Sequence, residues 1–182
     1  MKPVTRRKLL EYWWVAPVAA VGGFFAWFAT RSYNILLGKP VPSASPNFKA
    51  LARISIAKLE EFPALWDSKI FKYAGLDAIL VRVKAPQPGG ISPKADLHLL
   101  ALSRRCPHLG CTCEYIKNPE IAQMAYKYRP EYGHPVLGCA CHFSAFDPEL
   151  AGKSVSGPAL QPLPRIQLEI SRGQVYAVGL EG

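Results

Sequence analysis

Two short boxes of sequence, 27 residues apart, decide the fold of this chain. They read Cys106-Pro107-His108-Leu109-Gly110-Cys111 and Cys139-Ala140-Cys141-His142-Phe143-Ser144. Each box pairs a Cys with a His and carries a second Cys. Two thiolates and two imidazoles suit either a tetrahedral zinc ion or an iron–sulfur cluster with two His on one iron. The two boxes therefore predict one shared metal centre.

The spacing within the first box bears on the choice between these two centres. Cys106 and His108 are separated by one residue, whereas zinc sites usually pair ligands two to four residues apart. All five cysteines lie between Cys106 and Cys141, which indicates a local site and not a dispersed disulfide framework. A zinc-stabilised or disulfide-stapled binding module without a redox role is the alternative interpretation.

The two boxes together resemble the cluster boxes of Rieske iron–sulfur proteins. Their extra cysteines, Cys111 and Cys141, resemble in particular the Rieske subunits of the cytochrome bc1/b6f family. Soluble Rieske ferredoxins and Rieske oxygenases generally lack that extra pair. The resemblance extends to an N-terminal anchor, a linker, an all-β head, and Ser156-Gly157-Pro158-Ala159, which matches the proline loop that covers the cluster.

This resemblance implies a [2Fe-2S] Rieske cluster and a role for each residue around it. It makes Cys106 and Cys139 the metal ligands of the buried iron, and His108 and His142 those of the outer iron. It also implies a disulfide between the two loops, from the remaining box cysteines Cys111 and Cys141. The catalytic contact with quinol is expected from His142, with His108 next. The cluster environment is expected to comprise Leu109, Gly110, Phe143, Ser144, Phe146, Gly157 and Pro158.

The function that the resemblance implies is electron transfer within a quinol:cytochrome c (or plastocyanin) oxidoreductase. As a subunit of such a complex, and not catalytic alone, the chain would accept one electron from quinol at the cytochrome b subunit and pass it to a c-type cytochrome. Its expected partners are these two proteins, quinol and the membrane. The second interpretation is the small Rieske subunit of another exported oxidoreductase, such as an arsenite oxidase.

Some positions near the second box depart from the family pattern. Phe143 stands where the family usually has Gly, and we expect it to have an ordinary backbone conformation. Phe146 stands where many members have a Tyr that donates to a ligand sulfur, and the lost donor predicts a low potential compatible with menaquinol.

The Ser144 hydroxyl is expected to hydrogen-bond a bridging sulfide. We interpret Cys113 as a small buried apolar residue and not as a ligand.

The N-terminal segment predicts export and membrane insertion. Residues 1–11 form a basic N-terminus, expected in the cytoplasm, and residues 5–10 resemble a twin-arginine export signal. Residues 12–37 are mostly apolar and are predicted to be an uncleaved transmembrane signal anchor, with a buried core helix as the alternative. Residues 38–47 are rich in Pro and Ser and predict a flexible linker. The predicted localisation is a bacterial-type cytoplasmic membrane, single-pass, with the head on the outer (periplasmic or lumenal) side.

Residues 48–182 predict an all-β head, a small antiparallel β sandwich whose cluster-binding part covers about residues 103–160. A short helix is expected after Asn118, because Pro119 and Glu120 follow it as helix-start residues. Within this insertion, residues 126–129 are either a docking face or a solvated basic surface. The predicted strands are 52–58, 69–73, 78–84, 97–102, 165–170 and 174–178, the last two joined by a hairpin turn at 171–173.

The charge of the chain does not indicate nucleic-acid binding. The formal net charge of +9 includes a basic cluster near the N-terminus. From residue 48 onward the chain has 16 basic and 12 acidic residues, a net charge of only +4. That balance is ordinary for a solvated surface, so no nucleic-acid partner is expected.

Overall fold

The structure is a computed structural model that describes residues 13–36 and 46–182. Helix α2 (Val15–Leu36) and the head, residues 46–182, belong to two separate units of the chain, and each is described by itself. The predicted basic N-terminus with its twin-arginine motif lies outside the described residues. So does the predicted linker up to residue 45.

Helix α2 occupies the stretch predicted to be a membrane anchor. Within residues 13–36 and 46–182, no helix combines the length and the apolar character that a membrane crossing needs. Thr30, Arg31 and Ser32 interrupt the apolar run in its C-terminal part, and Gly22 and Gly23 add little apolar surface in the middle. The predicted transmembrane signal anchor over residues 12–37 is therefore wrong, and so is the single-pass membrane localisation with an outer head that was inferred from it.

The head is built from two antiparallel sheets. The larger sheet has seven strands in the order β1-β11-β10-β5-β3-β2, with β4 paired to β5. Its strands are β1 (Phe48–Lys58), β2 (Ser68–Tyr73), β3 (Leu76–Val83), β4 (Ile91–Lys94), β5 (Leu97–Ser103), β10 (Arg165–Ser171) and β11 (Gln174–Glu181).

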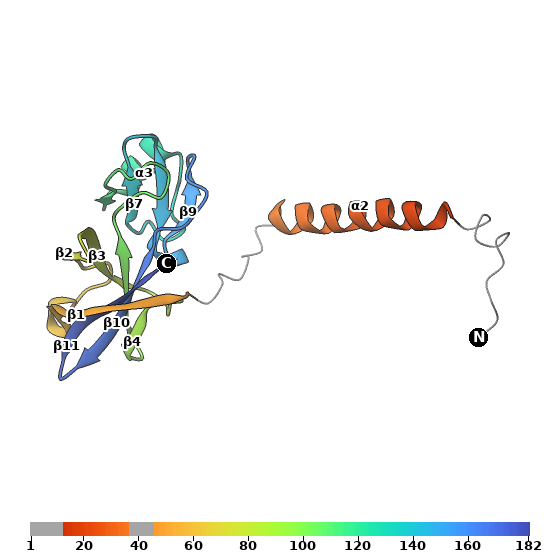
Figure 1. Ribbon diagram of the computed structural model, residues 1–182. Helices are drawn as coiled ribbons and strands as arrows, with labels where there is room; N and C mark the ends of the chain where they lie inside the picture. Colours follow the sequence, from red (N-terminus) through yellow and green to blue (C-terminus); the bar gives the residue numbers. More distant parts are fainter. Residues whose placement is uncertain (1–12, 37–45) are drawn as a thin grey trace, which may run out of the picture. The chain divides into compact units, whose positions relative to one another are not determined.

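The smaller sheet has four strands in the order β6-β7-β8-β9. They are β6 (Glu114–Ile116), β7 (Val136–Cys139), β8 (Ser144–Asp147) and β9 (Lys153–Ser156). Helix α3 (Pro119–Tyr126) lies between β6 and β7, and two short 3-10 helices, η1 (Leu59–Glu61) and η2 (Pro148–Leu150), complete the head. In Figure 1, α3, β7 and β9 gather at one end of the head, and β1, β4 and β11 lie toward the other.

Strands β3 and β5 connect the two halves of the head because both of their faces are buried. Side chains alternate between the faces of a strand, so Leu80 and Leu99 enter a core shared with β1, β10 and β11. Ile79 and Leu100 enter a second core, which also contains both cysteines of the predicted ligand set. The predicted metal centre is therefore supported by the central strands of the larger sheet.

All six predicted strands are confirmed, as are the hairpin and the inserted helix. β10 and β11 pair across a turn in which Arg172 and Gly173 have φ values of 51° and 75°, as tight hairpin turns require. At the start of α3, the Asn118 side chain accepts a hydrogen bond from the Glu120 N–H at 2.8 Å. The helix ends at Lys127, which has a left-handed backbone conformation.

The four strands of the smaller sheet were not predicted. Each has only three or four residues, too few for an alternating pattern to show. β4 was also missed, because it has only four residues and contains Pro93, a residue type that is rare inside strands. The head is thus β-rich as expected, and its cluster-binding part is more regular than its sequence indicated.

Candidate metal centre

The first box forms a tight loop between β5 and β6. The N–H of Cys106 donates to the carbonyl of Cys111 at 2.7 Å, and the N–H of Gly110 donates to the carbonyl of Cys106 at 2.9 Å. Gly110 has a φ of +81°, which glycine adopts without strain. This loop buries Cys106 at its base and presents Leu109 to solvent, with 70% of the side chain exposed.

The second box forms the turn between β7 and β8. Cys139 and Ser144 pair across the two strands, so residues 140–143 make the turn. Phe143 adopts a φ of +58°, and the expectation of an ordinary backbone conformation there is wrong. The tight turn requires a left-handed residue at this point, at a cost of roughly 1 kcal/mol for a residue with a side chain. The Phe143 ring remains more than half exposed.

A disulfide joins the two loops. It links Cys111 to Cys141 across Cα atoms that are 6.6 Å apart. This is the pairing that the resemblance implied. The bond ties the first loop to the second, and so restrains the relative position of the two boxes.

The structure gathers the predicted ligands as two pairs on these loops. The thiols of Cys106 and Cys139 are buried, and their sulfur atoms lie within 4.8 Å of each other and of the Cys113 sulfur. The rings of His108 and His142 lie 4.8 Å apart in an edge-to-face arrangement. His142 is exposed and His108 is half-buried. The site thus has buried sulfur donors on one side and imidazoles toward the surface.

His108 carries the clearest sign that these residues bind a metal. Its Nδ1 atom is buried and has no hydrogen-bond partner. A buried polar atom without a partner costs about 1–3 kcal/mol, so native proteins rarely leave one. Bonding to a metal would satisfy this nitrogen, and thiolate with imidazole is a donor set that iron–sulfur centres use. The residues therefore fit a Rieske cluster.

The surroundings of Cys106 act on its thiol in opposite directions. The pKa of Cys106 is raised, chiefly by burial and further by the neighbouring Cys139 thiol, whereas the N–H groups of His108 and Leu109 act against this rise by donating toward the sulfur. Burial also raises the pKa of Cys113 well above its usual range. Since a thiol must lose its proton to bind a metal, the two amides of the first loop favour the metal-binding form of Cys106.

The predicted proline loop, residues 156–159, lies against the second box. The Ala159 N–H donates to the Ser144 hydroxyl oxygen at 3.2 Å. Ser144 is fully buried and accepts this bond, so its own proton remains free to donate elsewhere. The expected hydrogen bond from Ser144 to a bridging sulfide is compatible with this arrangement.

Replacing Gly157 with Ala should destabilise the head strongly. The added Cβ would lie 2.5 Å from the Ser144 Cα and 2.6 Å from the Phe143 carbonyl oxygen, and Gly157 has a φ of +87°. Because both clashing atoms are backbone, we expect a loss of roughly 3 kcal/mol in the free energy of unfolding, measured by urea titration. The matched control is Gly75→Ala, which has a φ of +78° but no atom within 4 Å of the new Cβ. Equal losses in the two variants would contradict the close approach.

Phe146 is fully buried and lies opposite Leu137 on β7. It belongs to the same core as the thiols of Cys106, Cys113 and Cys139. Its ring therefore shares this apolar core with the thiols and carries no hydrogen-bond donor.

Introducing a hydroxyl by Phe146→Tyr should raise the midpoint potential of the centre. A hydrogen bond to a ligand sulfur stabilises the reduced, more negative state. A typical hydrogen bond of 0.5–1.5 kcal/mol corresponds to a shift of about 20–60 mV for one electron. Protein-film voltammetry measures this shift. Phe62→Tyr, at a buried Phe of the other core, is the control and should leave the potential unchanged. An unchanged or lower value for Phe146→Tyr would refute the expectation.

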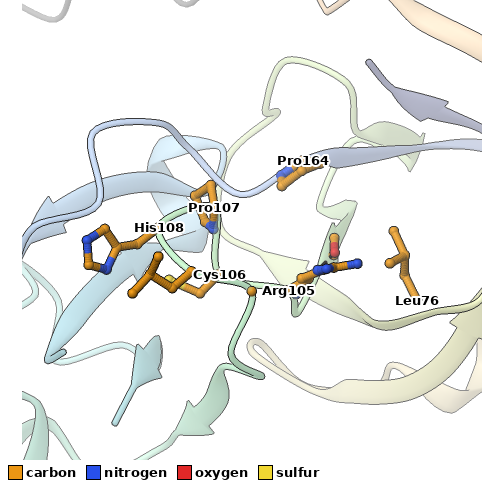
Figure 2. A pocket seen from close by; sticks show the side chains of 9 residues that line it. Leu76, Arg105, Cys106, Pro107, His108 and Pro164 are labelled. Carbon is orange, nitrogen blue, oxygen red and sulfur yellow. Dashed lines mark hydrogen bonds between the residues drawn. The ribbon is translucent and has the colours of Figure 1, made fainter. Parts of the chain in front are cut away.

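A cavity of about 300 Å³ opens beside the first loop. Figure 2 shows His108 toward one end of it and Leu76 at the other, with Arg105 between them. Pro107 and Leu109 also line it, so one flank of the first loop is not covered by packed side chains. The loop can therefore be approached from this flank as well as from its exposed tip.

A buried polar network between the segment after α3 and the end of β8 was not predicted from the sequence. The Tyr128 hydroxyl donates to Asp147 at 2.6 Å, and Nε2 of His134 lies 2.8 Å from the other carboxylate oxygen. The side chains of His134 and Asp147 are each only 2% exposed. No motif marks these residues, because the fold alone brings the segment after α3 next to the end of β8. The network fastens the insertion to the smaller sheet.

The residues proposed as a docking face on the insertion do not share one surface. Tyr126 is buried, and its ring lies so close to Gly138 that a Cβ there would be 2.4 Å from it. Tyr128 is bonded within the polar network. Only Lys127 and Arg129 of this set are exposed, which favours a solvated basic surface.

Comparison with known proteins identifies the class to which this fold and site belong. Residues 54–167 match the family model of the Rieske [2Fe-2S] domain. The chain therefore belongs to the Rieske [2Fe-2S] family. Its cofactor is a Rieske [2Fe-2S] cluster, and its general role is that of an electron-transfer subunit, as the resemblance implied.

Relatives of known function come from two kinds of oxidoreductase. The iodate reductase subunit IdrB of Denitromonas iodatirespirans is 31% identical over 176 residues, which cover 90% of this chain and 86% of the relative. The menaquinol:cytochrome c reductase iron-sulfur subunit of Bacillus subtilis is 25% identical over 174 residues, covering 95% and 90%.

Among solved structures, the soluble domain of Rieske protein II from Sulfolobus acidocaldarius has the same fold. The TM-score is 0.53 at 24% identity, and the match covers 74% of this chain and 82% of that one.

Proposed function

We propose that this chain is the Rieske electron-transfer subunit of a quinol:cytochrome c oxidoreductase. The observation that carries the proposal is the exposed rim around the imidazoles: His142 is exposed, and so are the apolar side chains of Leu109 and Phe143. A quinol presents an apolar ring with hydroxyl groups, so a site for it needs apolar contact and a hydrogen-bonding group together. This rim offers both, whereas the sulfur side of the centre is closed to solvent.

In this proposal, Cys106 and Cys139 hold the buried iron, and His108 and His142 hold the outer iron. When bound, a cluster of this kind takes up and releases one electron. Cys106 and Cys139 are only 2% and 1% exposed, so their bonds to iron are shielded from water. The disulfide holds the two loops together around the four ligands.

The proposed role of His142 is to receive a proton from the donor. An imidazole that bonds a metal through one nitrogen keeps the other free. In the exposed ring of His142 this second nitrogen, when it carries no proton, would accept a hydrogen bond from the quinol hydroxyl. An electron passed from the quinol to a bound cluster would add negative charge beside this ring and favour a proton on its nitrogen, so the proton of the quinol hydroxyl would move to His142. His108 is half-buried and is the less accessible of the two.

We further propose menaquinol as the electron donor and a c-type cytochrome as the acceptor, with a cytochrome b subunit completing the quinol site. A low-potential donor suits a centre that lacks a hydroxyl at Phe146, because fewer hydrogen bonds to sulfur give a lower potential. The relative from Bacillus subtilis is a menaquinol:cytochrome c reductase subunit and spans nearly the same length as this chain.

Placing a charge on the rim by Leu109→Arg should slow electron transfer from the donor. Burying an unpaired guanidinium against an apolar partner site is unfavourable, so we expect a loss of about tenfold or more in quinol:cytochrome c reductase activity of the purified complex. Iron content and midpoint potential should not change. The matched control is Ile70→Arg, which adds the same charge to an exposed aliphatic residue on β2. Equal losses in both variants would count against the rim as the docking surface.

Purification of the complex through a tag on this chain tests the proposal directly. The expected result is co-purification of a haem b protein and a preparation that reduces cytochrome c with menaquinol. The second candidate is a subunit of an iodate reductase, which the 31% identity to IdrB favours. A complex that reduces iodate, contains no haem b protein and shows no menaquinol:cytochrome c activity would contradict the first proposal and support the second.

A further inference from the structure

The centre contains a third buried thiol that the ligand set does not use. Cys113 is completely buried, and its sulfur lies within 4.8 Å of both the Cys106 and the Cys139 sulfur atoms. All three cysteines belong to the core formed with β3 and β5. A thiol can donate a hydrogen bond through its proton.

Backbone hydrogen bonds fix the position of Cys113. Its N–H donates to the carbonyl of Arg104 at 2.6 Å, and the Arg104 Nε donates to the carbonyl of Cys113 at 2.8 Å. Next to this pair, Arg105 and Thr112 form an isolated bridge at the base of the first loop. The Cys113 side chain is thus held toward the sulfur atoms by the same backbone that closes the loop.

The ligand sulfurs lie close to the Cys113 thiol within one apolar core. The other buried side chains of this core are aliphatic or aromatic, and Phe146 among them carries no donor or acceptor. The hydroxyl of Tyr115, which packs against this core, donates to the carbonyl of Trp66 at 2.9 Å. The Ser144 hydroxyl is engaged by Ala159 at the second box. In a Rieske centre, therefore, the sulfur atoms of the ligands and of the cluster are the acceptors available to the Cys113 proton.

We propose that Cys113 is a positioning residue of the redox centre, whose thiol donates an S–H···S hydrogen bond to the sulfur atoms around the buried iron and raises the midpoint potential. Hydrogen bonds to the sulfurs stabilise the reduced, more negative state of such a centre. The inference depends on the cluster that the family binds and not on which complex contains the chain. The proposed hydrogen bond from Cys113 partly offsets the lower midpoint potential that results from the absence of a hydroxyl at Phe146.

The test compares variants that remove the donor with one that retains it. In the full-length protein, Cys113→Ala and Cys113→Val should shift the midpoint potential to lower values, measured by protein-film voltammetry. Cys113→Ser should stay at or above the wild-type value, because a hydroxyl replaces the thiol as donor. Val81→Ala removes volume from the same core without removing a donor, and should leave the potential unchanged. Iron and sulfide content should remain full in all four.

The outcomes separate the proposal from its competitors. An unchanged potential in either Cys113→Ala or Cys113→Val would overturn it, and the two variants of different volume guard against one failing to fold. A Cys113→Ser potential as low as that of Cys113→Ala would show that packing and not donation matters, which also overturns it. Loss of iron from the Cys113 variants, with a changed EPR spectrum, would make Cys113 a ligand and refute the hydrogen-bonding role.

Discussion

The Cys139→Ala variant should lose its [2Fe-2S] cluster completely. Cys139 is only 1% exposed and supplies one of the two thiols proposed for the buried iron. Without it one iron coordination position has no protein donor. Cys113 is held in place by its backbone bonds to Arg104, so we do not expect it to take over. Iron, sulfide and visible absorption should all fall to background in the purified protein.

The control for this variant is Cys113→Ala, which removes a buried thiol from the same group of three. It should keep its full iron and sulfide content, because Cys113 is not among the proposed ligands. If Cys139→Ala retained the cluster with an unchanged EPR spectrum, the assignment of the buried ligands would be wrong. The same would follow if only the Cys113 variant lost its iron.

Removing the disulfide should give the second largest effect. Cys111 and Cys141 close a loop with a sequence separation of 30 residues. The chain-entropy relation for a loop of this length predicts a stabilisation of about 3–4 kcal/mol. The double variant Cys111→Ala/Cys141→Ala should therefore lose its visible absorption at a much lower urea concentration than the wild type.

A reductant offers an independent check on this prediction. Wild-type protein treated with a thiol reductant should lose the cluster at the same low urea concentration as the double variant, and the double variant should not respond to the reductant. If the double variant kept its absorption up to the same urea concentration as the oxidised wild type, the disulfide would not stabilise the centre.

The boxes and the longer strands could be predicted because their sequence carries local information. Cysteines and histidines at fixed spacing specify a centre wherever the chain folds around them, and the hairpin at Arg172 and Gly173 carries its own turn residues. β5 was readable as a strand for a different reason. With both faces buried, it contains a continuous apolar run from Leu99 to Leu102.

The features that were missed depend on distant parts of the chain. Phe143 is in a left-handed conformation because the disulfide-linked loops demand a tight turn, which its residue type does not predict. The nearness of Cys113 to the ligand thiols follows from the way the first loop packs onto β3 and β5. The network of His134 and Asp147 also arises only after the insertion folds back on β8.

The prediction of a membrane anchor was wrong because of the residue types that make up helix α2. Aromatic residues and glycines made the segment around α2 look continuously apolar, but they contribute less hydropathy than aliphatic side chains. Thr30, Arg31 and Ser32 then interrupt the run before it reaches spanning length. Counting uncharged residues overestimated the apolar character of this helix.

The proposed ligands of the [2Fe-2S] cluster are two cysteines and two histidines of this chain. Metal and sulfide analysis, combined with pulsed EPR of the reduced protein labelled with ¹⁵N-histidine, tests this assignment most directly. We expect two irons and two sulfides per chain, with hyperfine coupling to the nitrogens of two histidines, and loss of the coupling assigned to His142, or of the whole cluster, in the His142→Ala variant. A colourless protein that contains one zinc and no sulfide would contradict the assignment.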